Sequence, residues 1–193
     1  MPSPSVTLLG PADFRQMPWQ NGGGTTCELY RLPHPQRADA FALRLSIAQV
    51  AMGGPFSHFA GVDRELMLLE GDGMVLDFAD GRRETLDRPL QAPIRFAGEL
   101  AVDCRLIGGP LQDFNVMVAR DWGRTETQVI RLDAAETMTL PATGLVLIYV
   151  HTGRVTLAAT AIPAGHLALM SDDAAALLAD EASVAMVVHA TAV

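Results

Sequence analysis

Short stretches in which apolar and polar residues alternate recur along the whole chain. Along Phe41–Val50, apolar residues occupy every second position as far as Ile47. Arg44 and Ser46 lie between them, on the opposite face of the expected strand. Further strands are expected at Thr26–Leu32, Leu66–Leu69, Met74–Phe78, Val102–Ile107, Phe114–Val118, Thr127–Leu132, Leu145–Val150, Val155–Ala158, Leu167–Met170 and Val184–His189. Turn residues interrupt the chain about every eight to twelve residues, so the pattern predicts an all-β fold of the sandwich or barrel type.

Three stretches predict local structure other than a plain strand. Pro11–Gln16 fits one helical turn, and the alanine-rich segment Asp172–Ala182 fits a short helix. Glu70–Gly73, with the sequence EGDG, joins the apolar runs Leu66–Leu69 and Met74–Phe78. Its glycines are typical of a tight hairpin turn. We therefore expect a hairpin at this point and little helix, confined to the periphery.

A polar stretch beyond the middle of the chain indicates a domain boundary. Asp121–Glu126 separates two strand-rich regions that repeat each other weakly. Leu66–Val75 and Val146–Leu157 each read as an apolar run, a glycine turn and a second apolar run. The repeat predicts two β-barrels, one over residues 1–122 and a smaller, plainer one over residues 123–193.

The composition narrows the class of protein. Acidic residues outnumber basic ones by 22 to 14, and the resulting charge of -8 argues against a nucleic-acid partner, which requires clustered cations. All 14 basic residues are arginine, which excludes Schiff-base chemistry on lysine. The chain starts without the pattern of a signal peptide, and its longest apolar run, Leu145–Val150, is far too short to cross a membrane. Cys27 and Cys104 are too few for a disulfide framework, which is typical of a reducing compartment, although one bridge between them is left open. Together these features predict a cytoplasmic protein with no membrane partner.

The first candidate site is the glycine-rich segment Met17–Leu29, with the sequence MPWQNGGGTTCEL. Its three adjacent glycines, Gly22, Gly23 and Gly24, let backbone N–H groups approach a ligand closely. The side chains around them add an apolar wall and polar contacts. These side chains are Trp19, Asn21, Thr25, Thr26 and Glu28. The same pattern also fits a solvent-exposed turn that leads into an edge strand, so both interpretations stand.

The second candidate segment, Gly53–Gly71, is similar to the first metal motif of the cupin barrel. That motif contains two histidines one residue apart and then a glutamate. His58 and Glu65 match it, but Ala60 occupies the position of the second histidine. Two ligands are too few for a transition metal, which needs about three from the protein. The segment therefore predicts no metal site.

Other polar residues have two interpretations each. Arg64 offers a planar fork for a ligand carboxylate, or it bridges strands beside Asp63. Asp113 and Asn115 flank Phe114, so they share one face of a strand. On that face they bind a ligand at the mouth of a barrel, or they cap a turn. The residue types alone leave these alternatives open.

Three segments taken together resemble the HutD/Ves family: MPWQNGGGTTCELY, PFSHFAGVDRELMLLEG and DFNVMVAR. The order and spacing match over most of residues 6–120, whereas the second half matches only in general cupin character. The chain departs from the family at three positions. Gln20 stands where lysine is usual, Ala60 where proline is usual, and Ala119 replaces the first of an arginine pair. The change at Gln20 removes a cation from the expected rim of the pocket.

The resemblance implies an all-β bicupin, two cupin-like jelly-roll barrels in one chain, encoded with bacterial histidine-utilisation genes. It implies a non-catalytic protein without a cofactor that binds a small carboxylate, urocanate or N-formylglutamate, and tunes histidine catabolism. The alternative is an isomerase or hydrolase of a small carboxylate that uses His58, Glu65 and Glu28, with or without a metal. A homodimer formed through strand edges is left open. The residues expected to bind the ligand are Trp19, Asn21, Gly22, Gly23, Gly24, Thr25, Thr26, Glu28, Ser57, His58, Phe59, Asp63, Arg64, Asp113 and Asn115.

Overall fold

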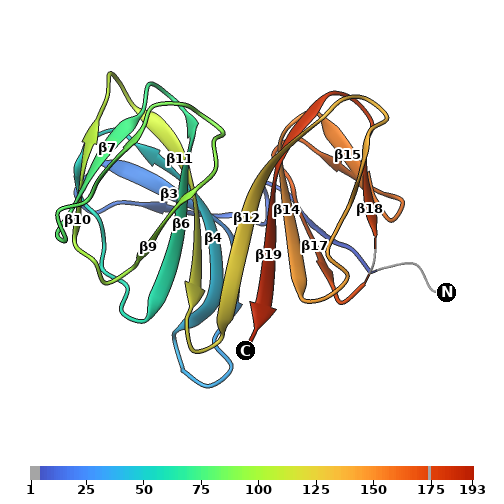
Figure 1. Cartoon of the computed structure of the whole chain (residues 1–193), viewed down its shortest axis with the longest axis horizontal. Coiled ribbons are helices and arrows are strands. Elements are labelled where there is room, and N and C mark those ends of the chain that lie inside the picture. Colours follow the sequence, from blue (N-terminus) through green and yellow to red (C-terminus); the bar gives the residue numbers. More distant parts are fainter. Residues whose placement is uncertain (1–4, 174) are drawn as a thin grey trace. The chain divides into compact units, whose positions relative to one another are not determined.

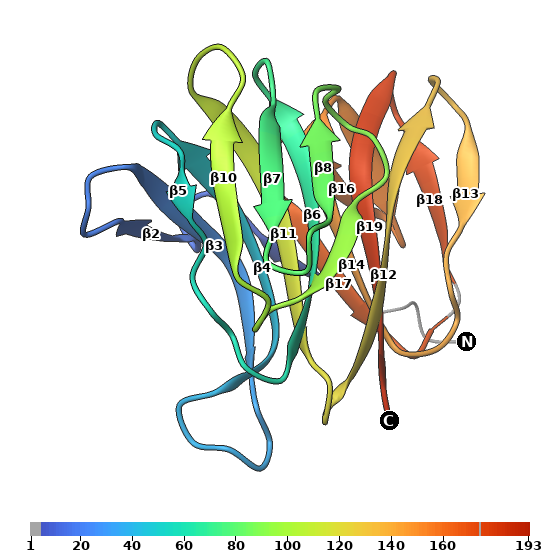
Figure 2. The same ribbon diagram turned by 60° about the vertical axis from the view of Figure 1, so that its left-hand side comes forward.

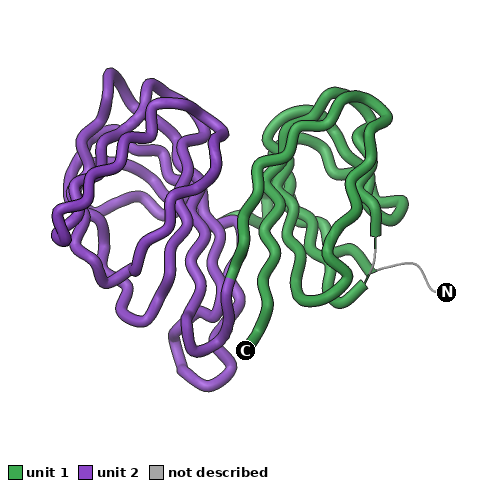
Figure 3. Tube along the Cα trace, in the orientation of Figure 1, with its two compact units in different colours: residues 1–14, 125–193 green, residues 15–124 purple. Residues whose placement is uncertain are grey.

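The computed structural model describes residues 5–173 and 175–193, in which strands are the only regular secondary structure (Figure 1, Figure 2). The all-β prediction is therefore confirmed. None of the described residues forms a helix long and apolar enough to cross a membrane. The chain divides into two compact units, coloured separately in Figure 3. Unit 2 is Arg15–Arg124, and unit 1 combines Thr125–Val193 with the N-terminal segment that ends at Phe14.

Unit 2 consists of two antiparallel sheets. Its strands are β2 (Arg15–Pro18), β3 (Gly24–Pro33), β4 (Phe41–Val50), β5 (Gly54–Pro55), β6 (Val62–Glu70), β7 (Met74–Phe78), β8 (Arg83–Leu86), β9 (Ile94–Ala97), β10 (Val102–Leu106) and β11 (Leu111–Ala119). The larger sheet has the order β2-β3-β4-β11-β6-β9 and the smaller one the order β5-β10-β7-β8. Apolar side chains of both sheets form one buried cluster, which includes Leu66 and Leu68 of β6 and Met74 and Leu76 of β7.

Unit 1 repeats this plan with fewer strands. They are β1 (Thr7–Leu9), β12 (Gly123–Leu132), β13 (Thr137–Thr139), β14 (Leu145–Thr152), β15 (Arg154–Leu157), β16 (Thr160–Pro163), β17 (Leu167–Ser171), β18 (Ala176–Ala179) and β19 (Ser183–Ala192). The sheets have the orders β1-β17-β14-β19-β12 and β13-β18-β15-β16. Val146 and Ile148 of β14 and Val155 and Leu157 of β15 belong to the buried cluster of this unit.

The strand pairing differs from the predicted barrels in two respects. Each unit holds two separate sheets rather than one closed barrel, so the prediction of closed barrels is corrected. In addition, the segment Thr7–Leu9 pairs with Leu167–Leu169 of β17. Hydrogen bonds to β17 thus place this segment in unit 1, whereas the sequence suggested one barrel over residues 1–122.

The predicted hairpin at Glu70–Gly73 is wrong. The strand before it, β6, pairs with β11 and β9, whereas the strand after it, β7, pairs with β10 and β8. The turn therefore carries the chain from the larger sheet of unit 2 to the smaller one. Two glycines between apolar runs fit such a crossing as well as a hairpin, and only the partners of the strands distinguish them.

The predicted helices are also absent from the described residues. Leu177 and Ala179 are buried while Ala176 and Leu178 are exposed, which is the period of a strand. Pairing of β18 with β13 and β15 outweighs the weak helical preference of alanine. Within Pro11–Gln16, residues 11–13 form a turn and β2 already begins at Arg15, so no helix forms there.

Candidate functional site

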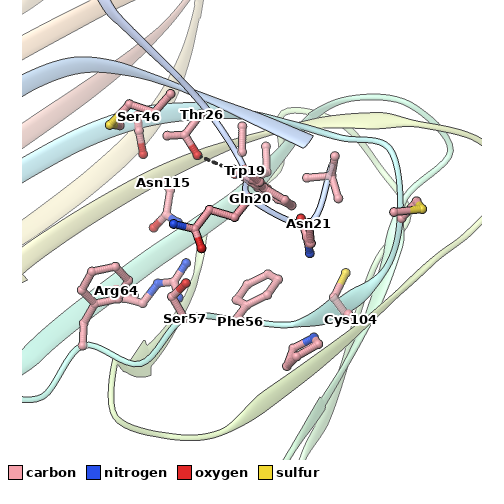
Figure 4. A pocket seen from close by; sticks show the side chains of 18 of the residues that line it. Trp19, Gln20, Asn21, Thr26, Ser46, Phe56, Ser57, Arg64, Cys104 and Asn115 are labelled. Atoms are coloured by element: carbon pink, nitrogen blue, oxygen red, sulfur yellow. Dashed lines mark hydrogen bonds between the residues drawn. The ribbon is translucent and has the colours of Figure 1, made fainter. Parts of the chain in front are cut away.

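Unit 2 contains a cavity of about 560 Å³ (Figure 4). Side chains of β3, β4, β6 and β11 supply one wall, and β2 with the loop after it, the segment around β5 and Cys104 of β10 supply the rest. The lining residues are Met17, Pro18, Trp19, Gln20, Asn21, Thr26, Arg44, Ser46, Ala48, Val50, Met52, Gly53, Gly54, Pro55, Phe56, Ser57, Phe59, Arg64, Cys104, Asp113, Asn115 and Met117.

Strand register brings the polar groups of this lining together. In β11, Asp113, Asn115 and Met117 alternate along one face, as residues two apart on a strand must. Met117 is paired with Arg44 of β4 on one side and with Arg64 of β6 on the other. Two arginines, one on each of the strands that pair with β11, therefore flank Met117 and line the same cavity.

Arg64 is a buried cation held among aromatic rings. Arg64 is only 5% exposed. Its Cζ atom lies 4.9 Å from the ring centroid of Phe56, 5.0 Å from that of Phe96 and 5.8 Å from that of Phe59. Burial lowers the pKa of Arg64 to about 10, and the charge of Asp113 opposes this shift only in part. Its Nε atom has no hydrogen-bond partner. The rings thus hold the guanidinium by cation–π contacts and leave it able to bind an anion.

Asp113 is the buried acid of the cavity. It is 3% exposed, and burial raises its pKa to about 7, while the charge of Arg64 acts in the opposite direction. The Oδ1 atoms of Asp113 and of Asn115 have no hydrogen-bond partner. A buried acceptor without a partner costs about 1–3 kcal/mol, so a ligand that donated hydrogen bonds here would recover that energy.

Arg44, the other arginine of the lining, is already neutralised. Its Nε atom donates to Oε2 of Glu28 over 2.6 Å, and both side chains are largely buried. Glu28 is therefore not part of the cavity lining but lies behind it, as the partner of Arg44. This pair holds the position of the Arg44 guanidinium.

The loop that contains Trp19 is fixed by its own hydrogen bonds. The Trp19 indole Nε1 donates to Oγ1 of Thr26 over 2.8 Å, which sets the ring against the cavity (Figure 4). The N–H of Gly23 donates to Oδ1 of Asn21 over 3.0 Å, and that of Gly22 donates to the Trp19 carbonyl over 3.1 Å. These two glycine N–H groups therefore stabilise the loop instead of facing a ligand, in contrast to the prediction.

Gly24→Ala is expected to lower the free energy of unfolding by about 1–3 kcal/mol, because overpacking forces backbone shifts. A Cβ atom at this position would lie 2.3 Å from the Gln49 carbonyl oxygen and 3.0 Å from the Trp19 ring. Urea denaturation measures the effect. Gly109→Ala is the control, since its Cβ would meet nothing within 4 Å. Equal stability of the two variants would contradict the close approach at Gly24.

The structure brings together part of the predicted ligand-binding set. The members that line the cavity are Trp19, Asn21, Thr26, Ser57, Phe59, Arg64, Asp113 and Asn115. Gly22, Gly24 and Thr25 line a separate cavity of about 520 Å³. His58 and Asp63 are exposed and line neither cavity. Gly23 and Glu28 are buried outside both linings. The predicted set is thus divided among two cavities, the surface and these two buried positions.

Sequence reasoning missed several lining side chains, among them Arg44, Ser46, Phe56, Cys104 and Met117. The alternation along Phe41–Val50 places Arg44 and Ser46 on one face of β4. Nothing local shows that this face encloses a cavity, because the facing elements come from distant parts of the chain. The signal that was available is two polar residues opposite an unbroken apolar face.

The donor set of the cavity does not fit a metal ion. Of the residue types that bind metals through a carboxylate, thiolate or imidazole, its lining contains Asp113 and Cys104. Burial raises the pKa of the Cys104 thiol to about 12, which opposes thiolate ligation. Within residues 5–173 and 175–193, no three His, Cys, Asp or Glu side chains are grouped to hold a metal. Arg44 and Arg64 on the same wall further disfavour a divalent cation.

The fold defines the class of the protein. It is similar to that of the bacterial pirin YhhW from Escherichia coli, solved in complex with nickel(II), with a TM-score of 0.69 at 14% identity over 96% of this chain and 98% of that chain. Such a likeness concerns the fold alone. The chain is a cupin-like, all-β protein with a polar cavity in one unit.

The family follows from closer similarities. The HutD family model matches residues 11–192, and the chain belongs to the HutD family. The 21.2 kDa protein in the hutC 3' region of Pseudomonas putida is 42% identical over 123 residues, a match that spans 64% of this chain and 63% of that protein.

Two solved structures are similar over nearly the whole chain. PA5104 from Pseudomonas aeruginosa PAO1, a conserved protein of unknown function, has a TM-score of 0.84 at 28% identity and covers 96% of this chain and 98% of its own. HutD from Pseudomonas fluorescens SBW25, solved in a formate condition, has a TM-score of 0.82 at 27% identity over 98% of this chain and 100% of that one.

Proposed function

We propose that the cavity of unit 2 binds a small carboxylate of the urocanate or N-formylglutamate class without converting it, and that this binding tunes histidine catabolism in the cytoplasm. The proposal includes a bicupin architecture, in which each unit is one cupin-like domain. The role is that of a sensor protein whose occupancy follows the level of a pathway acid.

Arg64 carries the proposal. Among the described residues, no carboxylate lies within ion-pairing distance of its guanidinium, although the side chain is almost entirely buried. A buried cation without an ion-pair partner is costly, and an anionic ligand is the group that would offset this cost. The planar fork of arginine matches a carboxylate with two parallel hydrogen bonds.

The remaining walls suit a small planar acid. The Trp19 ring and the Phe56 ring both line the cavity and offer flat apolar surfaces. A volume of about 560 Å³ is within the range of small-molecule sites. Support for the pathway comes from the HutD family itself and from the relative that lies in the hutC 3' region.

Thermal unfolding with added ligand tests the proposal. We expect urocanate or N-formylglutamate to raise the melting temperature, since a ligand at a hundredfold excess over its Kd stabilises the folded state by about 2.7 kcal/mol. Histidine, zinc, nickel and iron form the comparison series, and we expect smaller shifts with each. If neither acid shifts the transition, the proposed ligand class is wrong.

The alternative, an isomerase or hydrolase, is distinguished by product formation. His58 is exposed outside the cavity lining, and Oε1 of Glu65 pairs with Arg95 over 3.5 Å, so the structure does not gather these residues around a substrate. We expect NMR spectra of both acids to stay unchanged after long incubation with the protein, and His58→Ala to bind as the unaltered protein does. A product that disappears in His58→Ala would establish the enzyme instead.

A further inference from the structure

The net charge of the cavity lining limits the negative charge that a bound ligand can carry. The charged residues of the described lining are Arg44, Arg64 and Asp113. Glu28 neutralises Arg44 through the hydrogen bond of 2.6 Å. What remains is the cation of Arg64 and the carboxyl of Asp113. With Asp113 ionised the sum is zero, and with Asp113 neutral it is a single positive charge.

In either state the lining compensates at most one negative charge. A ligand with one carboxylate would pair with Arg64. A second carboxylate on the same ligand would meet no cation in the lining, and the transfer of an unpaired carboxylate from water into a buried site is unfavourable. The cavity therefore favours monoanions over dianions of the same size.

The cavity also offers acceptors that lack donors. The Oδ1 atoms of Asp113 and Asn115 are both buried and have no hydrogen-bond partner. The two residues are neighbours on one face of β11. Groups of this kind are satisfied by an N–H donor on the ligand, and a ligand that lacks the donor leaves them unpaired at a cost.

We propose that the cavity selects a monocarboxylate that carries an N–H donor and discriminates against dicarboxylates. The inference rests on the proposed function and specifies its ligand. Arg64 binds the carboxylate, while Asp113 and Asn115 receive the N–H group. Of the chemistries considered above, this is an imidazole monocarboxylate rather than an N-acyl dicarboxylate.

The neutral side chain of Gln20 leaves the lining without a second cation that could pair with a dicarboxylate. It lines the cavity from the loop after β2, and its neutral amide reaches into the space that Figure 4 shows. Gln20→Lys would add the second cation that a dicarboxylate requires. Gln49→Lys is the matched control, because Gln49 is an exposed residue of β4 outside this lining and changes the net charge equally. Gln20→Met controls for the loss of the amide.

Calorimetric titration with two matched pairs of ligands tests the proposal. N-formylglutamate and N-formylglutamine differ by one charge. Urocanate and 3-(2-furyl)acrylate differ in the ring, which carries an N–H donor only in urocanate. We expect N-formylglutamine to bind about tenfold or more tightly than N-formylglutamate, and urocanate to exceed the furan by about as much. In Gln20→Lys, the difference in affinity between N-formylglutamine and N-formylglutamate should shrink or invert. In Gln49→Lys and Gln20→Met, this difference should persist.

The outcomes separate this inference from the proposed function. If N-formylglutamate binds as tightly as N-formylglutamine, or the furan as tightly as urocanate, the selectivity is overturned while the carboxylate-binding function stands. If the difference in affinity between N-formylglutamine and N-formylglutamate were unchanged in Gln20→Lys, the charge argument would likewise be overturned. If none of the four compounds binds, the proposed function itself fails.

Discussion

Arg64→Met is expected to abolish carboxylate binding and at the same time to make the protein more stable. The variant removes the cation of the cavity, so affinity for urocanate or N-formylglutamate should fall by about a hundredfold or more. Methionine in its place would pack against Phe56, Phe59 and Phe96, which now surround the guanidinium. Replacement of a buried charge by an apolar group is often stabilising, so unfolding should cost about 1–3 kcal/mol more.

Calorimetry and urea denaturation at one pH measure the two effects. Arg82→Met is the matched control, because Arg82 also lies over a phenylalanine, Phe78, at 4.1 Å but does not line the cavity. It should bind ligand as the unaltered protein does. If the Arg64→Met protein still bound a carboxylate tightly, a group other than Arg64 would anchor the ligand. A large loss of stability would show that the guanidinium supports the fold rather than the site.

The best-predicted elements are strands whose two faces differ or whose ends are marked by glycine. Phe41–Val50 and Met74–Phe78 have the predicted bounds as β4 and β7. The two-residue strand β5, Gly54–Pro55, carries no pattern that could reveal it. Partners of strands were harder to predict than strands themselves, as the crossing at Glu70–Gly73 demonstrates. Pairing depends on residues far away in the chain, whereas periodicity is local.

The candidate site shows the same division between local and distant information. The shared face of Asp113 and Asn115 follows from the period of a strand, and both residues line the cavity. That Arg44 and Arg64 line the same cavity does not follow from the period of a strand, because it depends on β11 lying between β4 and β6. His58 lies in a loop, where spacing alone does not determine the direction of a side chain. His58 was expected among the ligand-binding residues, but the described lining of the cavity contains no histidine.

Asp113→Asn is expected to raise stability at alkaline pH and to leave it almost unchanged in acid. Burial raises the pKa of Asp113 from 3.8 to about 7 in the folded protein. Between these values the folded state retains a proton that the unfolded chain releases, so the free energy of unfolding falls as the pH rises from 3.8 to about 7. Asparagine cannot ionise and avoids this loss, which amounts to at most about 4 kcal/mol near pH 8.

Urea denaturation across this range of pH measures the difference, with Asp103→Asn as the control because Asp103 is exposed on β10. We expect the gap between Asp113→Asn and the unaltered protein to widen towards about pH 8 and the control to stay flat. The same ionisation opposes an anionic ligand, because the charges that face the cavity are then Arg64, the neutralised Arg44–Glu28 pair and an ionised Asp113. Carboxylate affinity should therefore decline above about pH 7 in the unaltered protein and not in Asp113→Asn. Equal destabilisation of Asp113→Asn at every pH would mean that Asp113 acts through hydrogen bonds and not as a buried acid.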